Sequence, residues 1–97
     1  MNLDGKVAII TGGAAGIGEV CCETFAKAGA ALVIADYDGN GARAVADRLI
    51  AAGAQAAAIE VDVSNEQACA KMVELAEERF GGLDCAVNCA GVGHTPA

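Results

Sequence analysis

The hydrophobic and polar positions along this chain alternate between two periods. Nearly continuous apolar runs, typical of strands buried on both faces of a sheet, cover residues 6–11, 31–36, 55–63 and 83–90. Between these runs, apolar residues recur every three or four positions, which is typical of helices with one buried face, over residues 17–28, 42–52 and 65–80. The pattern therefore predicts the element order β-α-β-α-β-α-β.

The ends of the predicted helices are marked by residues that favour helix termini. Ser64, with Gln67 three residues later, has the spacing of a capping box that begins the third helix. The segment "YDGNG" at residues 37–41 is expected to form a turn before the second helix. Glycines follow the last apolar position of each helix, where they commonly end it: Gly29, Gly53, Gly81 and Gly82.

Each predicted helix carries one face of apolar or small residues. These faces consist of Ile17, Cys21, Thr24 and Ala28 in the first helix, Ala42, Val45, Leu49 and Ala52 in the second, and Ala68, Met72, Ala76 and Phe80 in the third. Strands and helices that alternate in this way form a parallel sheet with right-handed crossovers and helices on both faces. The predicted fold class is α/β, the N-terminal half of a doubly wound parallel sheet, in a single domain over residues 1–97 that is truncated after its fourth strand.

The composition narrows the class of protein. Of the 97 residues, 55% are hydrophobic and only 3% aromatic, which predicts a small core built mainly from Ala, Val, Ile and Leu. Thirteen acidic and six basic residues give a net charge of −7. This charge argues against a nucleic-acid partner and against an anionic membrane surface, because both bind basic faces. No apolar run could span a membrane and no signal peptide is evident, so a cytoplasmic protein is expected.

The five cysteines, Cys21, Cys22, Cys69, Cys85 and Cys89, give an odd number without a C-x-x-C pair. They are interpreted as small hydrophobic residues in a reducing compartment. A metal site built on Cys85 and Cys89 is disfavoured, because no second cluster of ligands completes the set. No metal-binding residue is therefore predicted.

The stretch "TGGAAGIG" at residues 11–18 lies where the first strand is predicted to turn into the first helix. A helix N-terminus exposes unpaired N–H groups and the positive end of the helix dipole, and therefore suits an anion such as pyrophosphate. Gly12 is expected at the tight turn, Gly16 where the backbone approaches the phosphates, and Gly18 where the helix packs closely. Gly13 would add freedom to the loop. A glycine-rich turn without any ligand is the alternative.

Asp36 ends the second predicted strand, where a carboxylate can accept hydrogen bonds from both hydroxyls of an adenosine ribose. It would repel a 2′-phosphate, and its neighbour Tyr37 is not basic, so NAD is favoured over NADP. A solvated strand-end acid is the alternative. Tyr37 is expected beside the adenine pocket, without a role in the chemistry.

These motifs together resemble the short-chain dehydrogenase/reductase family, whose members have a Rossmann-type fold. The similarity rests on "LDGKVAIITGGAAGIG", on the strand-end Asp36, on "DV" at residues 62–63 and on "NCAG" at residues 88–91, in family order from Leu3 to Gly91. The resemblance implies that Asp62 contacts the adenine amino group and that Val63 flanks the ring. It also implies that the segment at residues 88–91 closes over the adenosine ribose.

One position departs from the family pattern, because Cys89 stands where the family motif N-N-A-G has its second asparagine. Cysteine has no amide side chain, so any contact there would run largely through the backbone. The residues expected to bind the cofactor are Gly12, Ala15, Gly16, Ile17, Gly18, Asp36, Tyr37, Asp62, Val63, Asn88, Cys89, Ala90 and Gly91.

The resemblance also implies catalytic residues that this sequence does not contain. The family uses a Ser, and a Tyr and Lys four residues apart, in the half of the fold that follows the fourth strand. The only tyrosine here is Tyr37, and it has no lysine four residues later. No catalytic residue is therefore assigned. His94 would lie near the nicotinamide as a candidate acid or base, and a loop residue without such a role is the favoured alternative.

The function expected for the complete protein is hydride transfer between NAD and a small alcohol or ketone, in a homodimer or homotetramer. The 97 residues are expected to be inactive alone, because the catalytic residues would lie beyond residue 97. They are also expected to fold poorly alone, because the fourth strand would leave an uncovered sheet edge. Two alternatives remain at this stage. One is a non-catalytic nucleotide-binding or interaction module, and the other is an epimerase or lyase relative that uses NAD.

Overall fold

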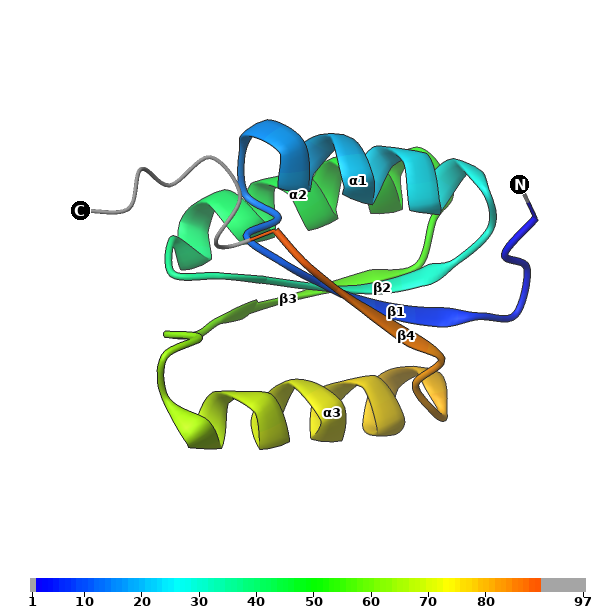
Figure 1. The fold of residues 1–97 in the computed structure, drawn as a ribbon. Coiled ribbons are helices and arrows are strands. Elements are labelled where there is room, and N and C mark those ends of the chain that lie inside the picture. The colour runs from blue at the N-terminus through cyan, green and yellow to red at the C-terminus, as the bar shows by residue number, and fades with distance from the viewer. Residues whose placement is uncertain (1, 90–97) are drawn as a thin grey trace.

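A computed structural model describes residues 2–89 of the chain (Figure 1). The strands lie parallel in one sheet of order β3-β2-β1-β4, and they are β1 (Val7–Thr11), β2 (Ala31–Asp36), β3 (Ala56–Glu60) and β4 (Cys85–Asn88). Two helices, α1 (Gly16–Lys27) and α2 (Gly39–Ala51), cover one face, and α3 (Glu66–Phe80) covers the other (Figure 1). The predicted N-terminal half of a Rossmann-like α/β fold is confirmed.

The side chains of the central strands alternate between two cores, because successive residues of a strand point to opposite faces. The core beneath α1 and α2 includes Ala8, Ile10, Leu32 and Ile34. The core against α3 includes Val7, Ile9, Val33 and Ala35. Burial on both faces explains why the two central strands have continuous apolar sequences.

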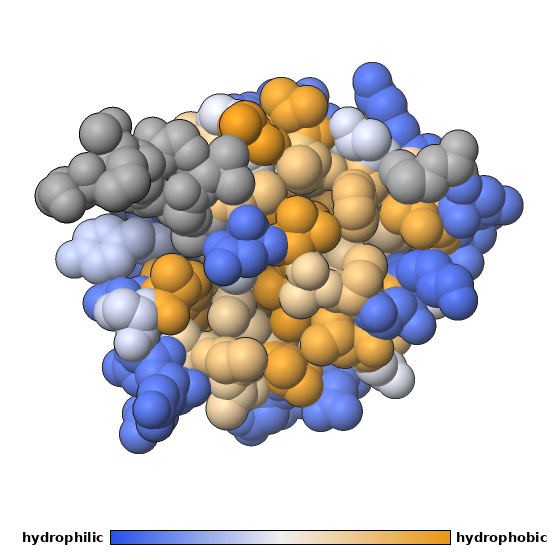
Figure 2. Space-filling view, in the orientation of Figure 1, coloured by the Kyte–Doolittle hydropathy of each residue, from blue (hydrophilic) through white to orange (hydrophobic). Residues whose placement is uncertain are grey.

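Strand β4 lies at one end of the sheet and pairs with β1 from Ala8↔Cys85 to Thr11↔Asn88. Asp84 aligns the two strands, since its backbone N–H donates to Val7 O at 2.8 Å and its carboxylate accepts from Val7 N at 2.8 Å. Three of the four β4 residues are exposed. Figure 2 shows the side of the molecule on which β4 lies, with apolar residues gathered in the middle of the view, over α1 and β4.

The packing face predicted for α1 is wrong in register. Ile17 is 58% exposed and Thr24 is also exposed, whereas Gly18 and Cys22 are the buried residues of the helix. Small side chains face the sheet because the start of α1 lies against the backbone of the preceding loop, as described below. The other two predicted residues, Cys21 and Ala28, are half-buried, and Cys21 packs against the core.

Helix α2 begins earlier than predicted, because the segment expected to be a turn forms its first turn. Asp38 is the N-cap residue, and its carboxylate accepts a hydrogen bond from Gly41 N at 2.9 Å. The first turn of a helix makes few internal hydrogen bonds, so the glycines cost little there once the cap is in place. At the other end, the predicted inward residue Ala52 is exposed, and Ala46 is buried instead.

Helix α3 has the predicted face, with Ala68, Met72 and Ala76 buried and Phe80 half-buried. Its predicted capping box is wrong. Asn65 is the N-cap and accepts from Gln67 N at 2.8 Å, whereas Ser64 donates to Asp62. The predicted glycine terminus is confirmed, since Gly81 has φ 82°. Strands β3 and β4 are shorter than the predicted ranges 55–63 and 83–90, and the last residue of that second range, Ala90, lies outside the described residues.

Candidate functional site

The glycine loop between β1 and α1 is held against the end of β2. Gly12 has φ 72°, a conformation that favours glycine, and its N–H donates to Ala35 O at 2.8 Å. The N-cap position of α1 is Ala15, which has no side-chain cap hydrogen bond. Because no side chain caps this end, the first N–H groups of α1 are available to an anion at the positive end of the helix dipole.

Position 18 requires glycine because there is no room for a side chain, and not because of its backbone conformation. A Cβ at this position would overlap Gly12 O and lie 2.6 Å from Gly12 C, so α1 lies directly against the loop that precedes it. A Cβ on Gly13 would lie 2.7 Å from Ile34 Cγ2, which gives this glycine a packing role where conformational freedom was expected. Gly16 has φ 60° and open space around its Cβ position, as a residue approached by a ligand requires.

Asp36 ties the glycine loop to the end of β2. Its carboxylate accepts from Ala14 N at 3.0 Å through Oδ2 and from Asp38 N at 2.8 Å through Oδ1. An ionised carboxylate offers about four lone-pair positions, so two remain for further donors. Sequence reasoning missed this link to the loop. The neighbouring Tyr37 is 78% exposed.

The end of β3 lies beside the end of β2, since Val61 N donates to Asp36 O at 3.0 Å. The next residue, Asp62, is exposed, and its Oδ1 accepts from the Ser64 hydroxyl at 2.6 Å and from Ser64 N at 3.0 Å. These two hydrogen bonds, the hydroxyl first, lower the pKa of Asp62 below its ordinary value. Val63 is 46% exposed. Both predicted adenine contacts therefore have accessible side chains.

Thr11 connects the glycine loop to the end of β4, and sequence reasoning did not select it as a site residue. It is nearly buried, and its hydroxyl donates to Asn88 Oδ1 at 2.9 Å. Cys89 N donates to Thr11 O at 3.0 Å, which continues the pairing of the two strands. The available signal was the threonine at the start of the glycine motif. Ala90, Gly91 and His94 lie outside the described residues.

The predicted residues of the described part of the chain meet at one edge of the sheet. The ends of β3, β2, β1 and β4 carry Asp62, Asp36, the glycine loop and Asn88, in the order in which the strands lie. The carboxyl ends of parallel strands are the usual ligand-binding edge of such a sheet. Across residues 2–89, no group of three or more His, Cys, Asp or Glu side chains is placed to hold a metal ion. No helix in this range is long and apolar enough to cross a membrane.

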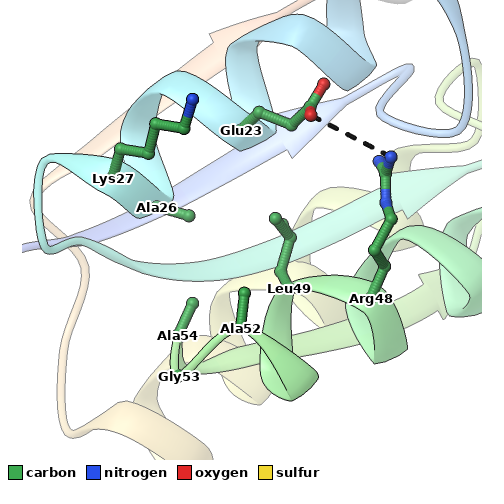
Figure 3. A pocket seen from close by; sticks show the side chains of 8 residues that line it. All are labelled: Glu23, Ala26, Lys27, Arg48, Leu49, Ala52, Gly53 and Ala54. Atoms are coloured by element: carbon green, nitrogen blue, oxygen red, sulfur yellow. Dashed lines mark ion pairs between the residues drawn. The ribbon is translucent and has the colours of Figure 1, made fainter.

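A hollow of about 400 Å³ lies away from this edge, between the second half of α1 and the end of α2 (Figure 3). Arg48 reaches across it, with Nη1 3.9 Å from Glu23 Oε2 and Nη2 2.7 Å from Glu19 Oε2. These pairs are half-exposed and contribute little to stability. None of the candidate residues described above lines this hollow.

Comparison with known proteins agrees with this geometry. The family model of the short chain dehydrogenases matches residues 6–97. The chain is 42% identical over 93 residues to 7alpha-hydroxysteroid dehydrogenase of Escherichia coli K12, covering 96% of this chain and 36% of that enzyme. It is 50% identical over 92 residues to sex determination protein tasselseed-2 of Zea mays, covering 94% of this chain and 26% of that protein.

A solved structure of a 7alpha-hydroxysteroid dehydrogenase, in complex with NADH and 7-oxo glycochenodeoxycholic acid, superposes with a TM-score of 0.86 at 41% identity. The match covers 90% of this chain and 34% of that one. The chain therefore spans about a third of the length of these dehydrogenases. The residues of the glycine loop and the sheet edge, together with the family match over nearly the whole sequence, establish that the chain belongs to the short-chain dehydrogenase family.

Proposed function

We propose that this chain is the cofactor-binding part of an NAD-dependent oxidoreductase that transfers hydride between NAD and a small alcohol or ketone. The observation that carries the proposal is the pairing of an uncapped helix N-terminus with Asp36 on the adjacent strand end. Support comes from the dehydrogenase relatives and from the related structure solved with NADH. NAD, when bound, supplies the carbon that accepts or donates the hydride.

The residues at the sheet edge would each hold a different part of the dinucleotide. Residues 12–18 would receive the pyrophosphate, because the N–H groups of the first turn of α1 face outward and Gly16 leaves open space. Asp36 would accept the ribose hydroxyls with its two remaining lone-pair positions. Asp62 and Val63 would flank the adenine, and residues 88–91 would lie over the adenosine ribose.

Preference for NAD over NADP follows from the charge of Asp36. The 2′-phosphate of NADP would lie against this carboxylate, and Tyr37, the next residue, carries no compensating positive charge. The hydrogen bonds from Ala14 and Asp38 hold the carboxylate at the strand end, so it cannot move aside without releasing the loop. Asp36 would therefore act as the residue that selects the cofactor.

The proton that accompanies hydride transfer needs a donor or acceptor next to the substrate. We propose that this group lies in a part of the protein beyond these 97 residues, since Tyr37 is the only tyrosine and belongs to the adenosine end of the site. The chain alone would then show no turnover. The complete protein would be a homodimer or homotetramer in the cytoplasm. The five free cysteines are consistent with this reducing compartment.

Asp36→Asn tests the role of the carboxylate. Losing the charge and one acceptor is expected to weaken NAD binding about tenfold or more, because a hydrogen bond to a charged group contributes about 1.5–3 kcal/mol. The ratio of NADP to NAD affinity, measured by calorimetric titration, should rise in the variant. Distortion of the loop alone would weaken both cofactors equally and leave the ratio unchanged, which would contradict the proposal. Asp47→Asn, the same change at an exposed position of α2, is the matched control.

A further inference from the structure

Two sulfur atoms lie in contact beside the glycine loop although their residues are far apart in the sequence. Cys89 Sγ lies 3.8 Å from Cys21 Sγ, across a separation of 68 residues. Cys21 belongs to α1 and Cys89 directly follows β4. The contact therefore joins the helix that begins at the glycine loop to the end of the outermost strand.

The backbone holds Cys89 in place, and Cys21 is fixed as a residue of α1. Cys89 N donates to Thr11 O at 3.0 Å, so the residue continues the pairing of β4 with β1. The thiol of Cys89 is buried in the core beneath α1 and α2. Cys21 is half-buried and lines an apolar hollow of about 490 Å³ on the outer side of α1, together with Ile17 and Val20. A small reagent can thus reach one of the two sulfurs from solvent.

We propose that Cys21 and Cys89 form a reversible disulfide, a modification site that goes beyond cofactor binding and does not depend on it. The sulfurs need to approach by about 1.8 Å from their present separation, since a disulfide bond is about 2.05 Å long. The oxidant is a small-molecule disulfide of the glutathione class.

The reaction proceeds by two exchanges. The Cys21 thiolate attacks one sulfur of the oxidant and forms a mixed disulfide, and the first reduced thiol leaves. Cys89 then loses its proton to solvent and attacks the Cys21 sulfur, and the second reduced thiol leaves. Two protein thiols are oxidised and one small disulfide is reduced to two thiols. Cys21 reacts first because it is the accessible partner, whereas burial raises the pKa of Cys89 and its contact with Cys21 raises it further.

The other three cysteines differ from this pair in ways that predict selectivity. Cys22 follows Cys21 in α1, but it is fully buried and its Sγ lies 4.0 Å from Gly13 O. Burial, reinforced by the neighbouring thiols and acids, raises the pKa of Cys22 to about 12, so almost no thiolate forms near neutral pH. Cys69 and Cys85 are exposed and would react with reagents or with other chains.

The test uses the full chain with Cys69→Ser and Cys85→Ser, which prevents linkage between molecules. The folded protein is incubated with oxidised glutathione, free thiols are then alkylated in denaturant, and the digest is analysed by mass spectrometry. We expect two of the three remaining thiols to be lost to one intramolecular disulfide and to return on treatment with dithiothreitol. Adding Cys21→Ser or Cys89→Ser should abolish the disulfide, and adding Cys22→Ala should leave it intact.

Three results would overturn the proposal. The first is that all three thiols remain alkylatable after oxidation of the folded chain. The second is a disulfide that contains Cys22 in place of Cys21, which would persist in the Cys21→Ser variant. The third is equal yield of the Cys21–Cys89 disulfide in folded and urea-unfolded protein, because the contact between the two sulfurs would then have no part in its formation.

Discussion

Asp36 accepts one hydrogen bond from the glycine loop and one from the residue that caps α2. The same carboxylate therefore positions the loop while keeping lone pairs for a ligand. From the sequence, Asp36 is an acid at the end of a strand, which fits either a contact with a ribose or a side chain exposed to solvent. It cannot reveal the bond to Ala14, because that contact depends on how the loop folds back over β2. The bond from the Thr11 hydroxyl to Asn88 was missed because it depends on the pairing of β1 with β4, two strands that lie far apart in the sequence.

Gly18 allows a test of the close contact between α1 and its preceding loop. Gly18→Ala adds a Cβ that overlaps Gly12 O, and neither atom can move without shifting the loop or the helix. Although alanine favours helix formation, we expect the free energy of unfolding to fall by about 1–3 kcal/mol, the usual cost of overpacking. Urea denaturation measures this change.

The matched control is Gly82→Ala, at a position where an added Cβ meets nothing within 4 Å. This variant should keep the stability of the parent chain or exceed it slightly, because alanine restricts the unfolded state. Equal stability of both variants would show that the loop and helix are not in the tight contact described.

At the scale of elements, the order of strands and helices was predictable because continuous apolar runs and helical spacing differ clearly in period. The buried face of α1 was not predictable from hydrophobicity. Its sheet side carries Gly18 and Cys22, whereas Ile17 and Val20 lie on the surface at 58% and 60% exposure. Close packing selects small residues at that interface, and a hydrophobic pattern selects large ones. The start of α2 was missed because glycines suggest a turn, while the Asp38 cap makes them acceptable in a helix.

The N-terminus of α3 provides a test at this scale. Asn65 accepts a hydrogen bond from Gln67 N, so Asn65→Ala should lower the free energy of unfolding by about 1 kcal/mol, the usual loss for a missing cap. Ser64→Ala removes only the bond to the exposed Asp62 and should cost clearly less. Thermal unfolding followed by circular dichroism compares the two variants. If Ser64→Ala lost more unfolding free energy than Asn65→Ala, Ser64 would be the cap, as the capping box in the sequence predicted.

At the scale of the whole molecule, the strand order brings residues from four separate parts of the sequence to one edge of the sheet. The opposite end of the helical layer holds the hollow between α1 and α2, which is lined in part by Glu23 and Arg48 (Figure 3). We propose that the dinucleotide binds at the sheet edge, where the backbone donors and the Asp36 carboxylate meet, and not in this hollow.

The most direct test of this assignment is a titration of NAD into the isotope-labelled protein, followed by the NMR shifts of its backbone amides. We expect the largest shifts at Gly13, Ala14 and Gly16, with further shifts at Asp36 and at residues 62–63, and weaker effects at equal concentrations of NADP. Shifts confined to residues around Glu23 and Arg48, or no shift in the glycine loop at saturating NAD, would contradict the account.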